Sequence, residues 1–171
     1  MSDTEAPPRT FSPNAAHLVR TVQQSHVQLS AMADQKASIL MGATFVVFTI
    51  AIGQARGGDA PPALLILGAA AFLSAVFAIL AILPATHYRG TGSDNLLFFG
   101  SFTQLGEAEW TERMFERLQA DESIYRTMLH DLYQNGTVLE RKKYRMLGWA
   151  YRIFLAGLTA SLAAFVWDAL S

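Results

Sequence analysis

Residues 63–83 of the sequence read ALLILGAAAFLSAVFAILAIL, with Ser74 as the one polar side chain. A helix needs about 20 predominantly apolar residues to cross roughly 30 Å of hydrocarbon. Pro84 follows this stretch, and a proline cannot continue the backbone hydrogen bonding of a helix. The stretch therefore predicts a transmembrane helix over residues 63–83.

Two further apolar stretches of similar length accompany this one, at residues 37–55 and at residues 147–168. Trp149 and Trp167 lie near the two ends of the later stretch, where the amphipathic rings of a membrane interface are expected. Together the three stretches predict an all-α integral membrane protein with three transmembrane helices. Residues 56–62 then form a short external loop between the first two spans.

The composition supports a membrane protein and limits its chemistry. The 171 residues are 51% hydrophobic and 16% charged, which is too apolar for an ordinary soluble domain of this length. A soluble helical bundle is the alternative, but three such helices leave too little polar chain to cover them. The absence of cysteine removes disulfides, thiolate zinc ligands and a thiol nucleophile. A net charge of −1 gives no overall field that would attract nucleic acid.

The positions of Lys and Arg predict the orientation in the membrane. Arg56 is the one basic residue between the first two spans, whereas the others precede the first span or fall between residues 85 and 152. Cytoplasmic loops carry an excess of Lys and Arg. We therefore expect a multi-pass protein with its N-terminus and residues 84–146 in the cytoplasm and its C-terminus outside.

The cytoplasmic part is predicted to be helical after a disordered tail. Residues 1–13 contain three prolines and little apolar surface to bury, which is typical of a disordered segment. Residues 14–36 have no proline and lead directly into the first span, so one helix is expected to cover both. Within residues 84–146, helices are expected at about 107–119 and from Asp121 unbroken into the third span, with Gly136 as a weak point. Long helices thus extend from the membrane into a cytoplasmic helical bundle.

A seam of apolar residues follows one face of the first helix and comprises Leu18, Val22, Leu29 and Met32. Because such a seam needs a partner helix and is longer than this small chain can cover, it predicts a homo-oligomer. Small residues in the second and third spans would let membrane helices approach closely, within one chain or between copies. These residues are Gly68, Ala69, Gly157, Ala160, Ser161 and Ala164.

No set of residues predicts catalysis. His130 and Asp131 match a dipeptide of metal-dependent phosphohydrolases, but the other histidines have no ligand spacing with them. The segment Gly90-Thr91-Gly92 lacks the third glycine and the following lysine of a phosphate-binding loop. We therefore expect no enzyme activity, no metal and no cofactor.

Several polar residues gather near the expected inner surface of the membrane. Asp34 and Lys36 lie about 200° apart around a helix, so they cannot both face one pocket. One of them is expected to pair with a neighbouring helix or protomer. Lys143 lies four residues after Leu139 and close to an apolar face that continues to Met146. Lys143 therefore differs from Arg141 and Lys142, which are expected to be ordinary exposed basic residues on the inner side of the membrane.

Three short motifs resemble, in order and spacing, the transmembrane effectors of the Pycsar antiphage systems, the PycTM-like proteins. The first motif, ADQKASIL at residues 33–40, leads into the first span. The second, NLLFFG at residues 95–100, follows the second span, and Lys143-Tyr144 leads into the third. The resemblance covers about residues 15–168.

The resemblance implies a defence role in the bacterial inner membrane. A functionally linked pyrimidine cyclase would make cyclic CMP or cyclic UMP on phage infection. The cytoplasmic helical region 84–146 would sense that messenger, and the effector would impair the lipid bilayer and cause abortive infection. The alternative, from a different class, is a structural or partner-binding membrane subunit with no nucleotide ligand.

A cyclic pyrimidine mononucleotide requires three kinds of group in its site. These are a cation for the phosphate, an aromatic platform for the base, and an amide or carboxylate for the edge of the base. Residues near the inner interface supply all three, although each aromatic side chain has core packing as an alternative role. The expected ligand-binding residues are Asp34, Lys36, Arg89, Asn95, Phe98, Phe99, Lys143 and Tyr144.

Overall fold

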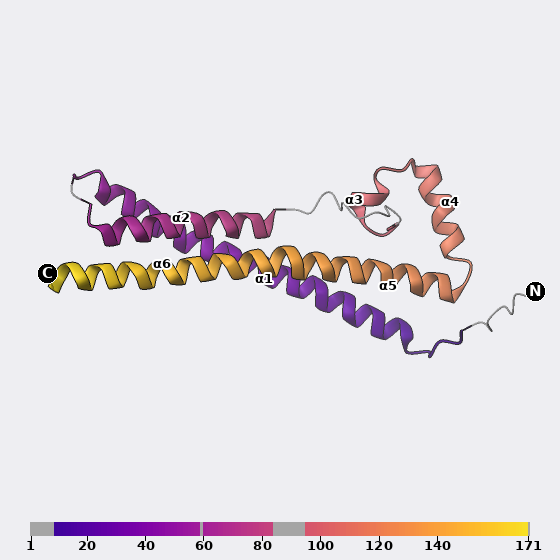
Figure 1. The fold of residues 1–171 in the computed structure, drawn as a ribbon. Coiled ribbons are helices and arrows are strands. Elements are labelled where there is room, and N and C mark those ends of the chain that lie inside the picture. Colours follow the sequence, from indigo (N-terminus) through magenta and orange to yellow (C-terminus); the bar gives the residue numbers. More distant parts are fainter. Residues whose placement is uncertain (1–8, 59, 84–94, 171) are drawn as a thin grey trace, which may run out of the picture. The chain divides into compact units, whose positions relative to one another are not determined.

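The structure, a computed structural model, describes residues 9–58, 60–83 and 95–170. The regular elements in these residues are all helical. They are α1 (Ala15–Ala55), α2 (Pro62–Ile82), α3 (Phe99–Phe102), α4 (Glu107–Arg117), α5 (Asp121–Val138), the π-helical segment η1 (Leu139–Tyr144) and α6 (Arg145–Leu170) (Figure 1). Three helical runs are long and apolar enough to cross a membrane, namely Ala15–Ala55, Pro62–Ile82 and Asp121–Leu170. The predicted class, all-α with three transmembrane helices, is confirmed.

The chain forms two compact units, and each is described by itself. The membrane unit comprises Gln28–Pro84 and Thr137–Ser171. The polar unit comprises Met1–Val27 and Ala85–Gly136. Helix α1 and the continuous run from α5 through η1 to α6 each contribute residues to both units.

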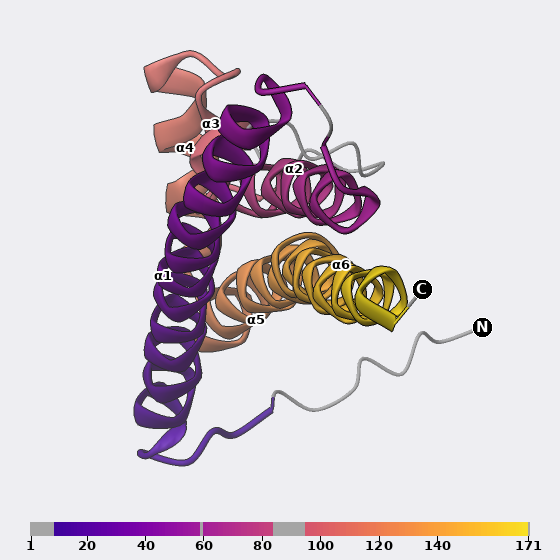
Figure 2. The ribbon, with the colours of Figure 1, turned by 90° about the vertical axis from the view of Figure 1, so that its left-hand side faces the viewer.

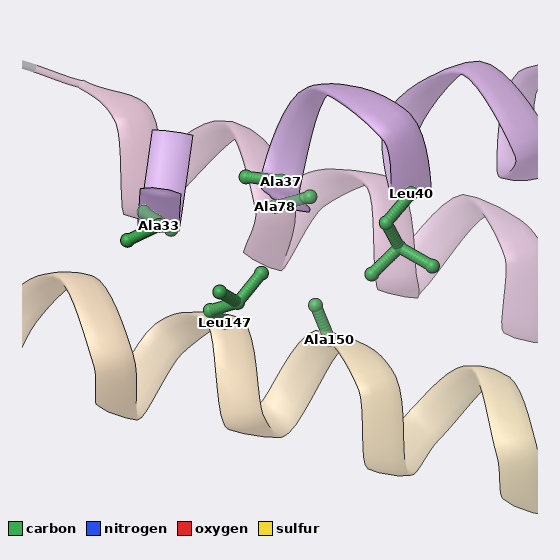
Figure 3. Close-up of a cluster of buried hydrophobic side chains, with 7 residues drawn as sticks. Ala33, Ala37, Leu40, Ala78, Leu147 and Ala150 are labelled. Atoms are coloured by element: carbon green, nitrogen blue, oxygen red, sulfur yellow. The ribbon is translucent and has the colours of Figure 1, made fainter. Parts of the chain in front are cut away.

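Small side chains form the core of the membrane unit. The buried residues at its centre are Ala33, Ala37 and Leu40 of α1, Ala78 and Ala81 of α2, and Leu147 and Ala150 of α6 (Figure 3). Figure 2 views α2 and α6 nearly end-on and shows them side by side. Because lipid tails are as apolar as leucine, close van der Waals contact between small residues is what favours association of helices in a bilayer.

Glycines bring the helices of the membrane unit especially close. A Cβ atom on Gly157 of α6 would collide with the Cβ of Ala70 of α2. A Cβ on Gly68 would lie 3.0 Å from the Cβ of Ala51. Of the small residues that the sequence singles out, these two glycines therefore pack within one chain. Ala69 and Ala160 are exposed in the single chain.

Two serine hydroxyls add polar ties between α2 and α6. Ser74 Oγ, which is fully buried, donates a hydrogen bond of 2.8 Å to the backbone oxygen of Ala150. Ser161 Oγ donates one of the same length to the oxygen of Ala63. Each bond satisfies a hydroxyl that would otherwise be unpaired among apolar groups, so polar side chains are compatible with these spans.

The helix predicted from Asp121 into the third span is confirmed, but it contains the unpredicted π-helical segment η1. The chain does not break at Gly136, which lies within α5. A Cβ on Gly136 would lie 3.1 Å from Cε1 of His26. Gly136 therefore makes room for the imidazole of α1, and its role is close packing.

The indole of Trp110 in α4 holds the segment before α3 in place. Trp110 Nε1 donates a hydrogen bond of 3.0 Å to the backbone oxygen of Leu96, and the ring packs on Phe102 with centroids 5.5 Å apart. Leu96 itself is buried. The predicted helix at about 107–119 is present as α4 and ends at Arg117, because the chain turns there before α5 begins.

Candidate functional site

Lys143 makes a polar link between η1 and α1 in the membrane unit. Its Nζ lies 2.8 and 2.7 Å from the two carboxylate oxygens of Asp34 and donates a third hydrogen bond of 2.7 Å to Ser30 Oγ. An ammonium group has three N–H donors, so all of its donor capacity is used. Of Asp34 and Lys36, one of which was expected to pair with a neighbouring helix or protomer, Asp34 is the residue that pairs with another helix.

Lys143 lies in the π-helical segment η1, on the same face as two buried leucines. Leu139 and Leu147, four residues before and after Lys143, are both buried, and the Lys143 side chain is 19% exposed. A π-helix has i→i+5 hydrogen bonds and fits more residues into each turn than an α-helix, and such segments are frequent at functional sites. A charge thus occupies a position that the pattern of the helix assigns to the core.

The ion pair is only partly shielded from its surroundings. The Asp34 side chain is 40% exposed, about twice the exposure of the lysine it binds. Exposed ion pairs contribute little to stability, whereas removing one partner of a buried pair is costly. The Asp34–Lys143 pair lies between these cases, because the lysine is the more buried of the two partners.

Two tyrosines also donate hydrogen bonds to α1, Tyr144 from η1 and Tyr151 from α6. Tyr144 Oη donates a hydrogen bond of 3.2 Å to the backbone oxygen of Leu29. Tyr151 Oη donates a weaker one of 3.4 Å to the oxygen of Lys36. The structure thus brings Asp34, Lys143 and Tyr144 together. The side chain of Lys36 is exposed and does not join them.

Asn95 belongs to a different cluster, in the polar unit. Its Nδ2 donates hydrogen bonds of 3.0 Å to Asp131 Oδ1 and 2.8 Å to Gln134 Oε1. Its Oδ1 accepts bonds from the backbone N–H groups of Leu97 and Phe98, at 3.0 and 3.1 Å. Asn95 is 2% exposed, and both amide hydrogens and the amide oxygen have partners within the chain. The cluster therefore fastens the segment before α3 to α5.

The remaining predicted site residues have separate positions. Phe98 and Phe99 contact each other with ring centroids 4.9 Å apart, and Phe99 is 56% exposed. They lie in the polar unit with Asn95, while Asp34, Lys36, Lys143 and Tyr144 lie in the membrane unit. Arg89 lies outside the described residues.

Sequence reasoning missed three residues of these clusters. Ser30 lies one helical turn before Asp34, and that i, i+4 spacing is a signal for a shared face. Asp131 was considered only as a metal ligand, whereas it accepts hydrogen bonds from Asn95 and from Asn135 Nδ2 at 2.9 Å. Gln134 follows Asp131 by three residues on the same face of α5.

Comparison with known proteins identifies a family. The family model described as "Pycsar effector protein domain" matches residues 17–168, which is most of the chain. No match was found among curated proteins or among solved structures.

Proposed function

Because the chain belongs to the Pycsar effector protein family, we propose that it senses a cyclic pyrimidine mononucleotide, cyclic CMP or cyclic UMP, and then impairs the membrane. The family supports a role as an antiphage defence effector. It is a family of transmembrane effectors and not a known family of enzymes. A linked pyrimidine cyclase supplies the messenger in this proposal, and abortive infection is the outcome.

The observation that carries the membrane part of this proposal is the Asp34–Lys143 link. It joins α1 to η1 just before the predicted first and third spans, residues 37–55 and 147–168. A ligand shifts an equilibrium between two states only through its different affinity for them. We propose that messenger binding favours a state in which this link is rearranged, so that the spans move against each other.

The proposed location is the bacterial inner membrane, with the N-terminus and residues 84–146 in the cytoplasm. The asymmetry of Lys and Arg supports this orientation. Reporter fusions at Gly58 and Gln104 test it. Activity of a periplasmic reporter at Gln104 but not at Gly58 would reverse the topology.

We also propose that the effector is a homo-oligomer. The seam residues Leu18, Val22, Leu29 and Met32 are all exposed in the single chain, from 37% at Val22 to 68% at Leu18. Apolar seams of this kind pack against a partner helix. A detergent-corrected mass of one chain, with and without messenger, would contradict assembly.

The same seam favours the second candidate function, a structural or partner-binding membrane subunit with no nucleotide ligand. The two candidates differ in whether a small molecule is needed. Only an effector should bind a cyclic pyrimidine mononucleotide and change the membrane in response to it.

The test is calorimetric titration of cyclic CMP and of cyclic UMP onto the purified full-length protein. Membrane potential is followed in parallel in cells that make each messenger. We expect one of the two to bind and to depolarise cells that express the protein. If neither binds the folded wild type, the effector function is wrong and the structural candidate is favoured.

The ligand-binding residues predicted from sequence remain a proposal that the same titration tests. Asn95 and Lys143 already have partners for all their hydrogen-bonding groups, so either would have to exchange a bond to contact a ligand. Among the ligand-binding residues predicted from sequence, Lys143→Ala is the variant that we test. It removes the cation proposed for the phosphate without introducing a new polar group.

A further inference from the structure

The polar unit contains a half-open cavity of about 600 Å³ that no part of the function described so far uses. Its walls come from the segment before α1, the end of α4 and the first half of α5. This volume lies within the range of about 300–1,000 Å³ that is typical of small-molecule sites. The cavity is large enough for a nucleoside monophosphate.

Positive charge exceeds negative charge around this cavity. Arg9, Arg117 and Arg126 line it, and Glu122 is the acidic residue among its lining. Glu122 Oε1 accepts hydrogen bonds of 2.9 and 2.6 Å from Nε and Nη2 of Arg126, and lies 3.9 Å from Nε of Arg9. Among the described residues, the guanidinium of Arg117 has no hydrogen-bond or ion-pair partner. The cavity lining thus carries three guanidinium groups and one carboxylate, which leaves a net positive charge for an anion.

Aromatic surface lies beside this charge. The rings of Phe11 and Tyr125 both line the cavity, with centroids 4.7 Å apart and planes tilted by 43°. The pair fixes the segment before α1 against α5, and it offers apolar ring faces on which a planar base can stack. A guanidinium that binds phosphate and a ring that stacks a base are the two recognition elements of a nucleotide site.

We propose that this cavity binds a compact anion that carries a planar ring, namely a nucleoside monophosphate. The identity of that ligand as cyclic CMP or cyclic UMP rests on the proposed function. Arg117 and Arg126 bind the phosphate, and Phe11 and Tyr125 hold the base. The carboxylate of Glu122 holds the Arg126 guanidinium in place through its two hydrogen bonds.

The position of the cavity gives binding a route to the membrane. Glu122, Tyr125 and Arg126 lie in the first two turns of the helical run Asp121–Leu170, which also carries Lys143. Because a continuous helix transmits a shift along its axis, movement of its first turns on binding changes the position of η1. In this proposal the cavity binds the messenger, and the Asp34–Lys143 link rearranges when it does.

The experiment measures the affinity of cyclic CMP and cyclic UMP for the full-length protein and for three variants. Arg117→Gln removes the unpaired cation and should weaken binding about tenfold or more, because charge-assisted hydrogen bonds are strong. Phe11→Leu removes a stacking face and should weaken binding several-fold. Arg20→Gln is the matched control, since Arg20 is an exposed arginine of α1 that does not line the cavity. The affinity of the Arg20→Gln variant for each messenger should equal that of the wild type.

The outcomes separate this inference from the function on which it rests. A wild type that binds a messenger while Arg117→Gln and Phe11→Leu bind it with unchanged affinity overturns the cavity and leaves the effector function intact. Loss of binding in Lys143→Ala alone also overturns the cavity as the site, and it favours the ligand-binding residues predicted from sequence. A wild type that binds neither messenger overturns the effector function, and the cavity loses its proposed ligand with it. Circular dichroism of each variant confirms that it is folded.

Discussion

The two units each contain a polar cluster, but the clusters differ in exposure to the surroundings. In the polar unit, Asn95 is 2% exposed and is held by Asp131 and Gln134. In the membrane unit, Lys143 binds Asp34, whose side chain is 40% exposed. Alanines and leucines form the surrounding core of the membrane unit.

This difference indicates different roles for the two clusters. A buried network in which every group is paired fixes one geometry, because loss of any member leaves the others unsatisfied. A partly exposed ion pair contributes only about 0–1 kcal/mol when it behaves as a surface pair, so it opens at little cost. The Asn95 cluster is therefore suited to hold the polar unit in one conformation. The Lys143 cluster is suited to be a joint, that is, a contact between α1 and η1 that can rearrange.

The largest effect is expected from Asn95→Ala. The change removes the Asn95 donor of Asp131 Oδ1 and Gln134 Oε1, and it removes the acceptor for two backbone N–H groups. We expect the free energy of unfolding of the polar unit to fall by about 2–4 kcal/mol. Urea denaturation measures this, with Trp110 as the fluorescent probe after Trp149 and Trp167 are changed to Phe.

Gln104→Ala is the control for this measurement. Gln104 Nε2 donates a hydrogen bond of 2.9 Å to the backbone oxygen of Gly100 on an exposed surface. Its loss should change the free energy of unfolding by less than about 0.5 kcal/mol. Equal midpoints for the two variants would mean that the Asn95 network does not hold the polar unit together.

The next effect concerns the close packing of the membrane unit. Gly157→Leu forces a side chain into Ala70, and such overpacking typically costs about 1–3 kcal/mol. Thermal unfolding in detergent, followed by circular dichroism, should show a lower midpoint. Gly42→Leu is the matched control, because a Cβ built at Gly42 meets no atom of another helix within 4 Å. A midpoint for Gly157→Leu as high as that of Gly42→Leu would show that α2 and α6 have room to separate.

The arrangement of helices could largely be predicted from sequence. Residues 63–83 predicted a span that the structure gives as Pro62–Ile82, since an apolar run and the flanking prolines are local signals. The segment η1 could not be predicted, because its sequence LERKKY is compatible with an ordinary α-helix. The partners of Lys143 in α1, Ser30 and Asp34, are tertiary contacts that the local sequence does not encode.

The candidate site was only partly visible in the sequence. The angle between Asp34 and Lys36 predicted that one of them would pair elsewhere, but its partner Lys143 is 109 positions away. Arg9 and Phe11 fall in the segment predicted to be a disordered tail, a prediction whose residues 1–8 lie outside the described residues. Phe11 nevertheless contacts Tyr125, because a ring in a polar segment packs wherever the folded chain offers an apolar surface.

A smaller effect is expected when the joint itself is changed. Asp34→Ala leaves the ammonium of Lys143 with Ser30 as its remaining partner. We expect each of Asp34→Ala and Lys143→Ala to lower the free energy of unfolding by about 1 kcal/mol, with a coupling energy of about 0.5–1 kcal/mol between them. A double-mutant cycle in detergent measures this. A coupling as large as the loss in Asn95→Ala would make the pair a fixed scaffold element and remove the contrast between the two clusters.

The smallest effect is expected from Tyr144→Phe, which deletes the hydroxyl that binds the backbone oxygen of Leu29 at 3.2 Å. This bond is exposed, so water replaces it, and the free energy of unfolding should change by no more than about 0.5 kcal/mol. The ring remains, so messenger affinity should also be unchanged. Tyr151→Phe is the matched control, because its hydroxyl makes the longer bond of 3.4 Å to Lys36. If Tyr144→Phe instead depolarises cells that lack any messenger while Tyr151→Phe does not, the hydroxyl next to Lys143 holds the resting state, and the joint is held by more than its ion pair.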